Sequence, residues 1–125
     1  MDHSPRFLAL VDDTKKKIKE TSTAEVRARL ERGDRFELVD VREDREWDAG
    51  HVRGARHLGR GVLERDIEKA IPDLGAEIVL YCGGGFRSAL AADSLRQMGY
   101  TRVLSMAGGW KAWVAEGGPT DKGGE

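Results

Sequence analysis

The spacing of hydrophobic residues near the start of the chain predicts an amphipathic helix. Phe7, Leu10, Val11 and Ile18 fall close to helical spacing, and three consecutive lysines follow on the exposed side. We therefore predict a helix over residues 6 to about 16 that docks on the domain or on a second subunit. The lysine run is interpreted as a solvated face of this helix rather than as a binding patch.

Start and stop signals predict a second helix. Residues 22–25, Ser-Thr-Ala-Glu, have the form of a capping box, in which a hydroxyl and a carboxylate satisfy reciprocal backbone donors. Val26 and Leu30 follow one turn apart, and Gly33 can end the helix in a left-handed conformation. These signals bracket one amphipathic helix between the serine and the glycine.

Strand and helix patterns then alternate along the chain. Apolar runs at residues 36–41 and 78–81 predict strands, and the second run is typical of a central parallel strand buried on both faces. The remaining patterns predict, in order, a helical turn over residues 44–48, a helix from Leu63 to Ile71 stopped by Pro72, a helix through Ala91, Leu95 and Met98 that ends at Gly99, a strand at 103–106 and a helix at 110–114. Strands that alternate with helices imply a parallel sheet covered on both faces.

The two ends of the chain differ from its middle. We assign residues 1–19 to an N-terminal helical extension and residues 20–119 to one folded domain. Residues 120–125 are assigned to a flexible tail, because the chain from Gly117 onward is rich in glycine, proline and charge.

Composition narrows the class of protein. The chain has 125 residues, enough for one domain and not comfortably for two. Its 21 basic and 22 acidic residues give a net charge of −1, which argues against a nucleic-acid footprint spread over the whole surface. No apolar run approaches the ~20 residues needed to span a bilayer, and no secretory signal pattern begins the sequence. We expect a cytoplasmic protein that binds neither nucleic acid nor membrane.

Cys82 is the only cysteine of the chain, so a disulfide within the chain and a zinc site built from several cysteines are excluded. The three histidines are scattered and show no metal-ligand spacing. We therefore expect no metal and no cofactor. A lone thiol can stay reduced in the cytoplasm.

The segment around Cys82 carries the candidate chemistry. Cys82 ends the buried strand at 78–81, and a helix starts near Arg87 or Ser88. Ligand sites in open α/β sheets form beyond the carboxyl ends of the strands, so the cysteine lies where this architecture places chemistry. Three glycines, residues 83–85, permit backbone angles that let successive N–H groups converge on one point. With the helix N-terminus and Arg87, they would stabilise a thiolate or hold an oxyanion. The alternative is a small buried cysteine beside a plain turn.

The same segment resembles the active-site loop of the rhodanese family, Cys-x-x-Gly-x-Arg-Ser, which is matched by Cys82, Gly85, Arg87 and Ser88. Three other family patterns occur in the same order as in the family. Residues 40–42 are similar to its Asp-x-Arg strand end, residues 46–55 to its Glu-aromatic-x-x-Gly-His-Ile-x-Gly-Ala signature, and residues 108–113 to its Gly-Gly-x-x-Ala-Trp ending. The resemblance covers residues 20–119.

The resemblance implies a three-layer α/β/α fold around a five-stranded parallel sheet, and a sulfurtransferase activity. Cys82 would attack the outer sulfur of a small anionic donor such as thiosulfate and become a persulfide. It would then pass the sulfur to an acceptor such as cyanide, a small thiol or a protein thiol. The donor would be bound by the loop, that is, by Gly83, Gly84, Gly85, Phe86, Arg87 and Ser88. Arg87 would either hold the anionic donor or brace the loop.

Three residues before the loop are expected to support the site. Asp40 and Arg42 end the strand that should neighbour the strand leading to Cys82, so they should stand on the same rim. They would brace the loop, or Arg42 would contact the substrate. Glu46 follows Arg42 by four residues, a spacing that permits an ion pair on a helical turn, and it could instead reach Arg87.

Other functions remain open. Cysteine-type phosphatases and arsenate reductases resemble rhodaneses in fold but carry Cys-x5-Arg, a loop one residue longer than Cys82 to Arg87. A non-catalytic rhodanese-like module for binding or regulation is another alternative, although such modules often lack the cysteine. His51 suggests a Cys–His hydrolase, but the resemblance places it in a structural turn. Three tryptophans are interpreted as core residues: Trp47, Trp110 and Trp113.

The sequence departs from the family pattern at Arg53, where proline is frequent, and in the loop. Gly83 and Gly84 stand where the family often has a polar or basic side chain. We therefore predict an open, weakly selective mouth above Cys82. We also predict a positive φ for at least one glycine of residues 83–85.

Overall fold

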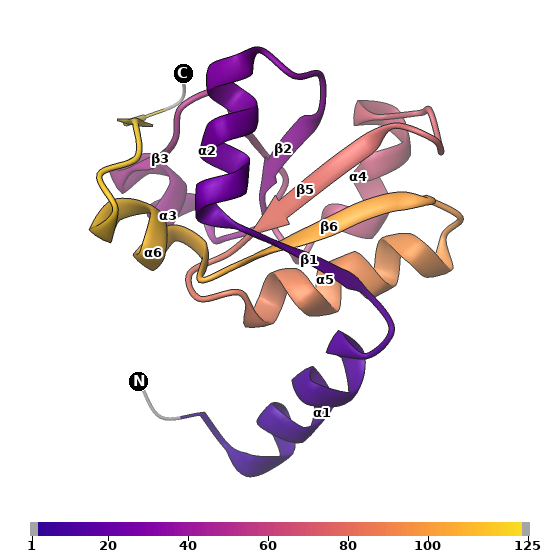
Figure 1. Ribbon diagram of the computed structural model, residues 1–125. Coiled ribbons are helices and arrows are strands. Elements are labelled where there is room, and N and C mark those ends of the chain that lie inside the picture. Colours follow the sequence, from indigo (N-terminus) through magenta and orange to yellow (C-terminus); the bar gives the residue numbers. More distant parts are fainter. Residues whose placement is uncertain (1–2, 124–125) are drawn as a thin grey trace.

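A computed structural model shows a central parallel sheet with helices on both faces (Figure 1). The structure describes residues 3–123. Five strands form the sheet in the order β1-β6-β5-β2-β4, and each pairing is parallel. The predicted five-stranded α/β fold is confirmed. These strands are β1 (Lys19–Ser22), β2 (Glu37–Asp40), β4 (Arg56–His57), β5 (Glu77–Tyr81) and β6 (Arg102–Ala107).

The described helices cover the sheet from two sides. They are α1 (Pro5–Lys15), α2 (Thr23–Arg32), α3 (Asp44–Ala49), α4 (Leu63–Ala70), α5 (Phe86–Gln97) and α6 (Gly109–Ala115). One buried cluster joins β2 and β5 to α4 and α5, and the second joins β5 and β6 to α2 and α6. None of the helices among residues 3–123 is long and apolar enough to cross a membrane.

The central strand β5 shows why the sheet is buried on both sides. Ile78 and Leu80 point into the cluster under α4 and α5, whereas Val79 and Tyr81 point into the cluster under α2 and α6. This alternation is the period of two that a strand imposes on its side chains. Cys82 continues the first series, so its side chain lies at the edge of the α4–α5 layer.

The start of α2 follows its sequence signals. The Ser22 hydroxyl accepts the N–H of Glu25 at 3.0 Å, and Gly33 ends the helix at a φ of +76°. This bond is the serine half of the capping box predicted at residues 22–25. A capping box with both bonds is found at α3, where the side chains of Glu43 and Glu46 each bond to the other's backbone. The preceding strand β1 was not predicted, because Lys19–Ser22 is polar and lies at the sheet edge, where backbone pairing with β6 suffices.

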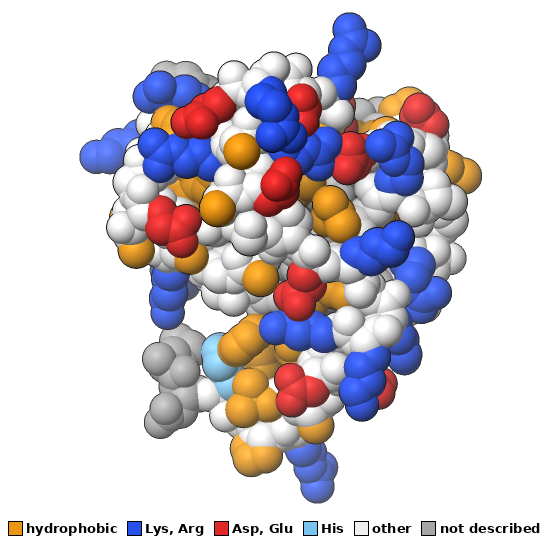
Figure 2. Space-filling view, viewed as in Figure 1, with side chains coloured by type: hydrophobic (Ala, Val, Ile, Leu, Met, Phe, Trp, Pro, Cys, Tyr) orange, Lys and Arg blue, Asp and Glu red, His pale blue; other side chains and the backbone are white. Residues whose placement is uncertain are grey.

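Helix α1 docks on its own domain. It packs on the outer side of α5, below the sheet in Figure 1, and buries Val11 and Thr14. Of the two docking partners that the sequence left open, the structure shows the domain itself. On the face seen in Figure 2, charged side chains of both signs lie interspersed, in keeping with the near-zero net charge.

The predicted flexible tail is wrong at residues 120–121. These residues form β7 (Thr120–Asp121), which pairs antiparallel with β3 (His51–Val52). The carbonyl of Pro119 accepts both the indole N–H of Trp113, at 3.0 Å, and the backbone N–H of Arg53, at 3.1 Å. These bonds hold a segment whose composition alone favours disorder. The last two tail residues, 124 and 125, lie outside the described part of the chain.

Candidate active site

The sulfur of Cys82 lies among backbone N–H donors at the end of β5. Its Sγ accepts the N–H of Gly85 at 3.1 Å and the N–H of Ser88 at 3.3 Å, and the side chain is 1% exposed. Ser88 belongs to the first turn of α5, where N–H groups have no partner within the helix. The loop therefore presents positive partial charges to the one thiol of the chain, an arrangement that stabilises a negatively charged sulfur.

The turn that makes this possible depends on Gly85. Its φ is +97°, so at least one of the three glycines has a positive φ, as predicted. A Cβ at this position would also lie 3.3 Å from the backbone N of Gly108. Gly84 differs, because its φ lies outside the left-handed range and a Cβ there would meet nothing within 4 Å.

A second glycine turn, formed by Gly108 and Gly109, holds the backbone of the Cys82 loop. The N–H groups of Trp110 and Lys111, at the start of α6, donate to the carbonyls of Cys82 and Gly83 at 2.8 and 3.0 Å. A Cβ at Gly109 would overlap the carbonyl oxygen of Cys82, so only glycine permits this approach. In the sequence, Gly108 and Gly109 stand out only as part of the family's Gly-Gly-x-x-Ala-Trp ending.

A pair of buried hydroxyls lies behind the sulfur. The Oγ of Ser88 is 3.6 Å from the Sγ of Cys82 and 2.8 Å from the Oγ of Ser105 on β6. Both serines are fully buried. Sequence reasoning missed Ser105, whose signal was a polar residue inside an otherwise apolar strand.

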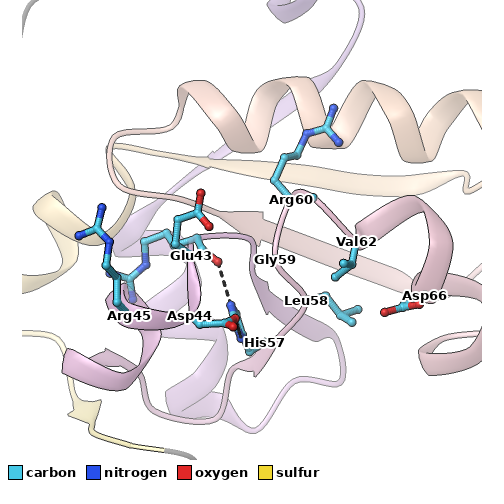
Figure 3. Close-up of a pocket in the computed structure, with 11 residues that line it drawn as sticks. Glu43, Asp44, Arg45, His57, Leu58, Gly59, Arg60, Val62 and Asp66 are labelled. Atoms are coloured by element: carbon cyan, nitrogen blue, oxygen red, sulfur yellow. Dashed lines mark hydrogen bonds and ion pairs between the residues drawn. The ribbon is translucent and has the colours of Figure 1, made fainter.

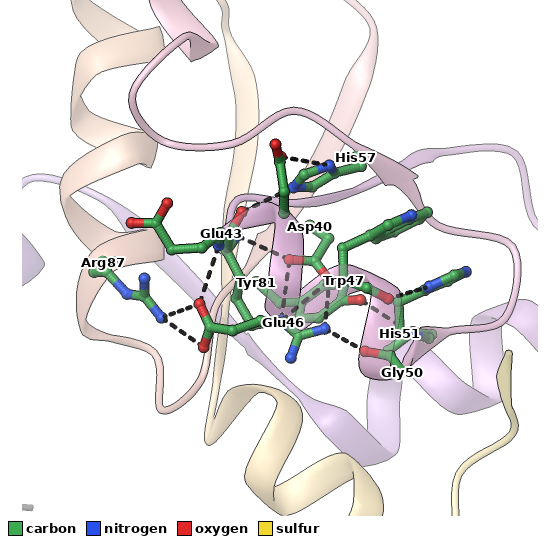
Figure 4. A network of polar contacts seen from close by, with 12 residues as sticks. Asp40, Glu43, Glu46, Trp47, Gly50, His51, His57, Tyr81 and Arg87 are labelled. Carbon is green, nitrogen blue, oxygen red and sulfur yellow. Dashed lines mark hydrogen bonds and ion pairs between the residues drawn. The ribbon is translucent and has the colours of Figure 1, made fainter. Parts of the chain in front are cut away.

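Glu46 pairs with Arg87 across the mouth of the loop (Figure 4). The guanidinium Nη2 lies 3.4 Å from one carboxylate oxygen and 3.5 Å from the other. Burial alone would raise the pKa of Glu46, but the N–H of Glu43 and the charge of Arg87 outweigh it and hold that pKa below its ordinary value. Of the two partners that the sequence left open for Glu46, the structure shows Arg87.

Arg42 is held away from the mouth by Asp40. Its Nη2 lies 2.8 Å from the Asp40 carboxylate and 2.6 Å from the carbonyl of Gly50, and both charged side chains are buried. Burial would lower the pKa of Arg42, but the hydrogen bonds to Asp40 outweigh it and raise that pKa, so the guanidinium stays charged. Of the two roles considered for Arg42, this geometry favours the brace, because its guanidinium is occupied by the Asp40 carboxylate and the Gly50 carbonyl.

His51 is part of this structural layer. Its ring stacks on Trp47 with centroids 3.4 Å apart, and its Nδ1 lies 3.0 Å from the Trp47 carbonyl oxygen (Figure 4). The buried ring lines neither of the two clefts near the site. Trp47 and Trp113 are buried, and the half-buried Trp110 lies 4.7 Å from the guanidinium of Arg42.

A cleft of about 490 Å³ opens above Cys82. Gly83 and Gly84 line this cleft and contribute no side chain to it, as expected. Neighbouring elements build the walls: His3 and Phe7 come from the N-terminal segment, and Arg45 and Lys111 come from α3 and α6.

A second cleft of about 650 Å³ adjoins the first and shares Glu43 and Arg45 with it. Two of its polar residues, Arg60 and His57, have partners in the structure, and Figure 3 shows the contact of His57. Arg60 pairs with Glu64, and His57 bonds to the Arg42 carbonyl at 2.8 Å. It contains no cysteine, so the reactive group belongs to the first cleft. Within residues 3–123, no cluster of three or more His, Cys, Asp or Glu side chains could hold a metal ion.

Sequence comparison agrees with this geometry. Residues 22–116 match the family model of the rhodanese-like domain. The chain belongs to the rhodanese-like family. Among rhodanese-like relatives, the putative sulfurtransferase YtwF of Bacillus subtilis is 33% identical over 102 residues, which span 82% of this chain and 96% of YtwF. The uncharacterized protein YqhL of the same organism is 36% identical over 77 residues, 62% of this chain and 60% of YqhL.

A solved structure extends the likeness to nearly the whole chain. The protein RPA3614 from Rhodopseudomonas palustris has a TM-score of 0.86 and 31% identity, and the match covers 97% of this chain and 99% of that one. It is described as a protein of unknown function and possible tyrosine phosphatase. The match therefore includes a region beyond the rhodanese-like domain, where α1 lies.

We predict that Arg42→Met destabilises this rhodanese-like domain by about 3–5 kcal/mol, because it leaves the buried Asp40 carboxylate unpaired. The control is Arg53→Met, which removes an exposed ion pair. The Arg53 side chain is 64% exposed and that of its partner Asp121 is 38% exposed. Exposed pairs contribute about 0.2–1 kcal/mol. Urea unfolding measures the loss in free energy of unfolding for both variants, and equal m-values show that the unfolding transitions are comparable. Equal losses of stability in the two variants would contradict the role of the Arg42–Asp40 pair as a structural brace.

A second prediction concerns the loop. Gly85→Ala should lower the free energy of unfolding by about 1–2 kcal/mol, because alanine is strained at a positive φ. Gly84→Ala is the matched control and should leave stability unchanged or raise it by up to about 1 kcal/mol. Urea unfolding of both variants compares them. Coinciding midpoints would show that the geometry at Gly85 is not a constraint.

Proposed function

We propose that the protein transfers sulfane sulfur from a small anionic donor such as thiosulfate to an acceptor thiol or cyanide, through a persulfide on Cys82. The observation that carries this proposal is the convergence of the Gly85 and Ser88 N–H groups on the sulfur. A nucleophilic thiolate and a terminal persulfide are both anions. The same donors can therefore stabilise the sulfur before and after it accepts a second sulfur atom.

The charge around the cleft favours an anionic donor. Arg45, Arg87 and Lys111 line it against two carboxylates, Glu43 and Glu46. Arg87 is held by Glu46 through one nitrogen and its side chain remains 36% exposed, so it can brace the loop and attract an anion at once. A nucleophile that needs a reduced thiol suits a reducing compartment, and we propose the cytoplasm.

A phosphatase is the second candidate, because RPA3614 is described as a possible tyrosine phosphatase. The loop length argues against it. Four residues separate Cys82 from Arg87, one fewer than the five of the cysteine-type phosphatases, and a tighter ring of N–H groups suits one sulfur atom better than a tetrahedral phosphate. A non-catalytic module is disfavoured by the intact cysteine and its donors.

The test is the mass of the intact protein after exposure to thiosulfate. We expect a gain of about 32 Da, one sulfur atom, in the parent and none in Cys82→Ser. Cyanide or a small thiol should then remove the gain. An aryl phosphate offered to the same protein should not be hydrolysed. Uptake of sulfur by Cys82→Ser would remove Cys82 as the carrier, and no uptake from any sulfur donor would favour a binding module.

A further prediction separates the two roles of Arg87. If Arg87 holds the donor, Arg87→Ala should lower kcat/KM for thiosulfate roughly 10- to 100-fold, since a hydrogen bond to a charged group contributes about 1.5–3 kcal/mol. Glu46→Gln removes the brace but keeps the cation, so it should cost clearly less. Steady-state kinetics measures both. Equal losses in the two variants would leave Arg87 only as a brace.

A further inference from the structure

One wall of the Cys82 cleft is built in part from residues outside the matched domain. The family match begins at residue 22, whereas His3 and Phe7 belong to the N-terminal segment and line the cleft together with Phe86 of α5. Figure 2 shows hydrophobic side chains and a histidine gathered where α1 meets the body of the molecule. This wall is therefore a feature that the rhodanese-like domain alone does not supply.

The three rings of this aromatic wall contact one another. The ring centroids of His3 and Phe86 are 4.8 Å apart and those of Phe7 and Phe86 are 6.2 Å apart, both in edge-to-face geometry. These separations lie in the range of favourable aromatic pairs. Buried Val11 anchors α1 on the domain, and the Lys15 ammonium lies 5.2 Å from the Phe86 ring centroid. The wall is thus held in place rather than hanging free.

The rest of the cleft is polar and cationic. Lys111 and Arg45 are exposed, and neither forms an ion pair with any residue in the described part of the chain. Arg87 lies deeper, beside the loop. A ligand in this cleft meets the backbone donors beside Cys82, three cationic side chains set against the carboxylates of Glu43 and Glu46, and the aromatic rings. Its volume of about 490 Å³ falls in the range of organic ligand sites, about 300–1,000 Å³.

We propose that the donor is an organic sulfane-sulfur anion with an apolar group, whose carbon body rests on the aromatic wall of His3, Phe7 and Phe86. This inference rests on the proposed function. The outer sulfur of the donor must reach the Sγ of Cys82 at the floor, so the remainder of the molecule extends toward the mouth. A thiosulfate dianion has no carbon body and would leave the aromatic wall uncovered.

The transfer step balances without an added reactant. The Cys82 thiolate attacks the outer sulfur of an organic thiosulfonate, and a bond forms between that sulfur and Sγ. The bond from the outer sulfur to the sulfonyl sulfur breaks, and its electron pair leaves with the organic sulfinate. One anion enters with the donor and one leaves as the sulfinate, while the negative charge of Cys82 moves to the persulfide. No proton or oxidant is consumed.

The experiment compares benzenethiosulfonate with methanethiosulfonate as donors and cyanide as acceptor. The measured quantity is kcat/KM for benzenethiosulfonate divided by kcat/KM for methanethiosulfonate. Both donors react by the same chemical step, so a change in this ratio between variants reports on binding of the phenyl group. Phe7→Ala should lower this ratio about three- to tenfold, the effect of losing one aromatic pair. Phe7→Leu keeps an apolar side chain of similar size and should retain more of the ratio than Phe7→Ala. This variant controls for a displacement of α1 caused by loss of packing.

The matched control is Leu10→Ala, which removes a side chain of the same helix that is 53% exposed and lies outside the cleft. It should keep the parental ratio. An unchanged ratio in Phe7→Ala, or an equal fall of kcat/KM with both donors, would overturn the aromatic wall as a specificity element. No sulfur transfer from any donor to the parent protein would instead refute the proposed sulfurtransferase function.

Discussion

The close approach of two glycine turns is the constraint on which the rest of the site depends. The Gly108–Gly109 turn brings the first N–H groups of α6 against the carbonyls of Cys82 and Gly83. With those carbonyls held, the next peptides of the loop turn their N–H groups toward the sulfur, and a positive φ at Gly85 completes the turn. Backbone N–H groups therefore face the sulfur, and such donors need no reorientation when charge develops on it.

The two charged pairs around the site differ in burial. Asp40–Arg42 is fully buried and satisfied by the Gly50 carbonyl, whereas Glu46–Arg87 is partly exposed and loosely paired at 3.4 Å. Burial makes the inner pair a fixed support, since breaking it would leave an uncompensated charge. The outer pair has no such constraint, so its cation can respond to an anion in the cleft. Arg42 and Arg87, which are far apart in the sequence, can thus serve different ends at one site.

The sequence allowed the layers, the order of the main elements and the position of the reactive loop to be predicted, because each rests on local periodicity or on a turn residue. It left open what depends on contacts across the chain. The partner of Glu46 is set by the tertiary position of Arg87, and the hydroxyl contact of Ser105 is set by the register of β6 beside β5. The strands β1 and β7 are polar and short, so their pairing leaves no hydrophobic signal.

The dependence of the loop on α6 also has a consequence for the order in which the molecule is made. The residues that hold the carbonyls of Cys82 and Gly83 are Trp110 and Lys111, which follow the cysteine by nearly thirty positions. A growing chain that has just exposed Cys82 has neither these donors nor the glycine turn before them. A chain that ends before α6 lacks the two hydrogen bonds that hold these carbonyls, so the full support of the Cys82 loop is in place only after synthesis has passed α6.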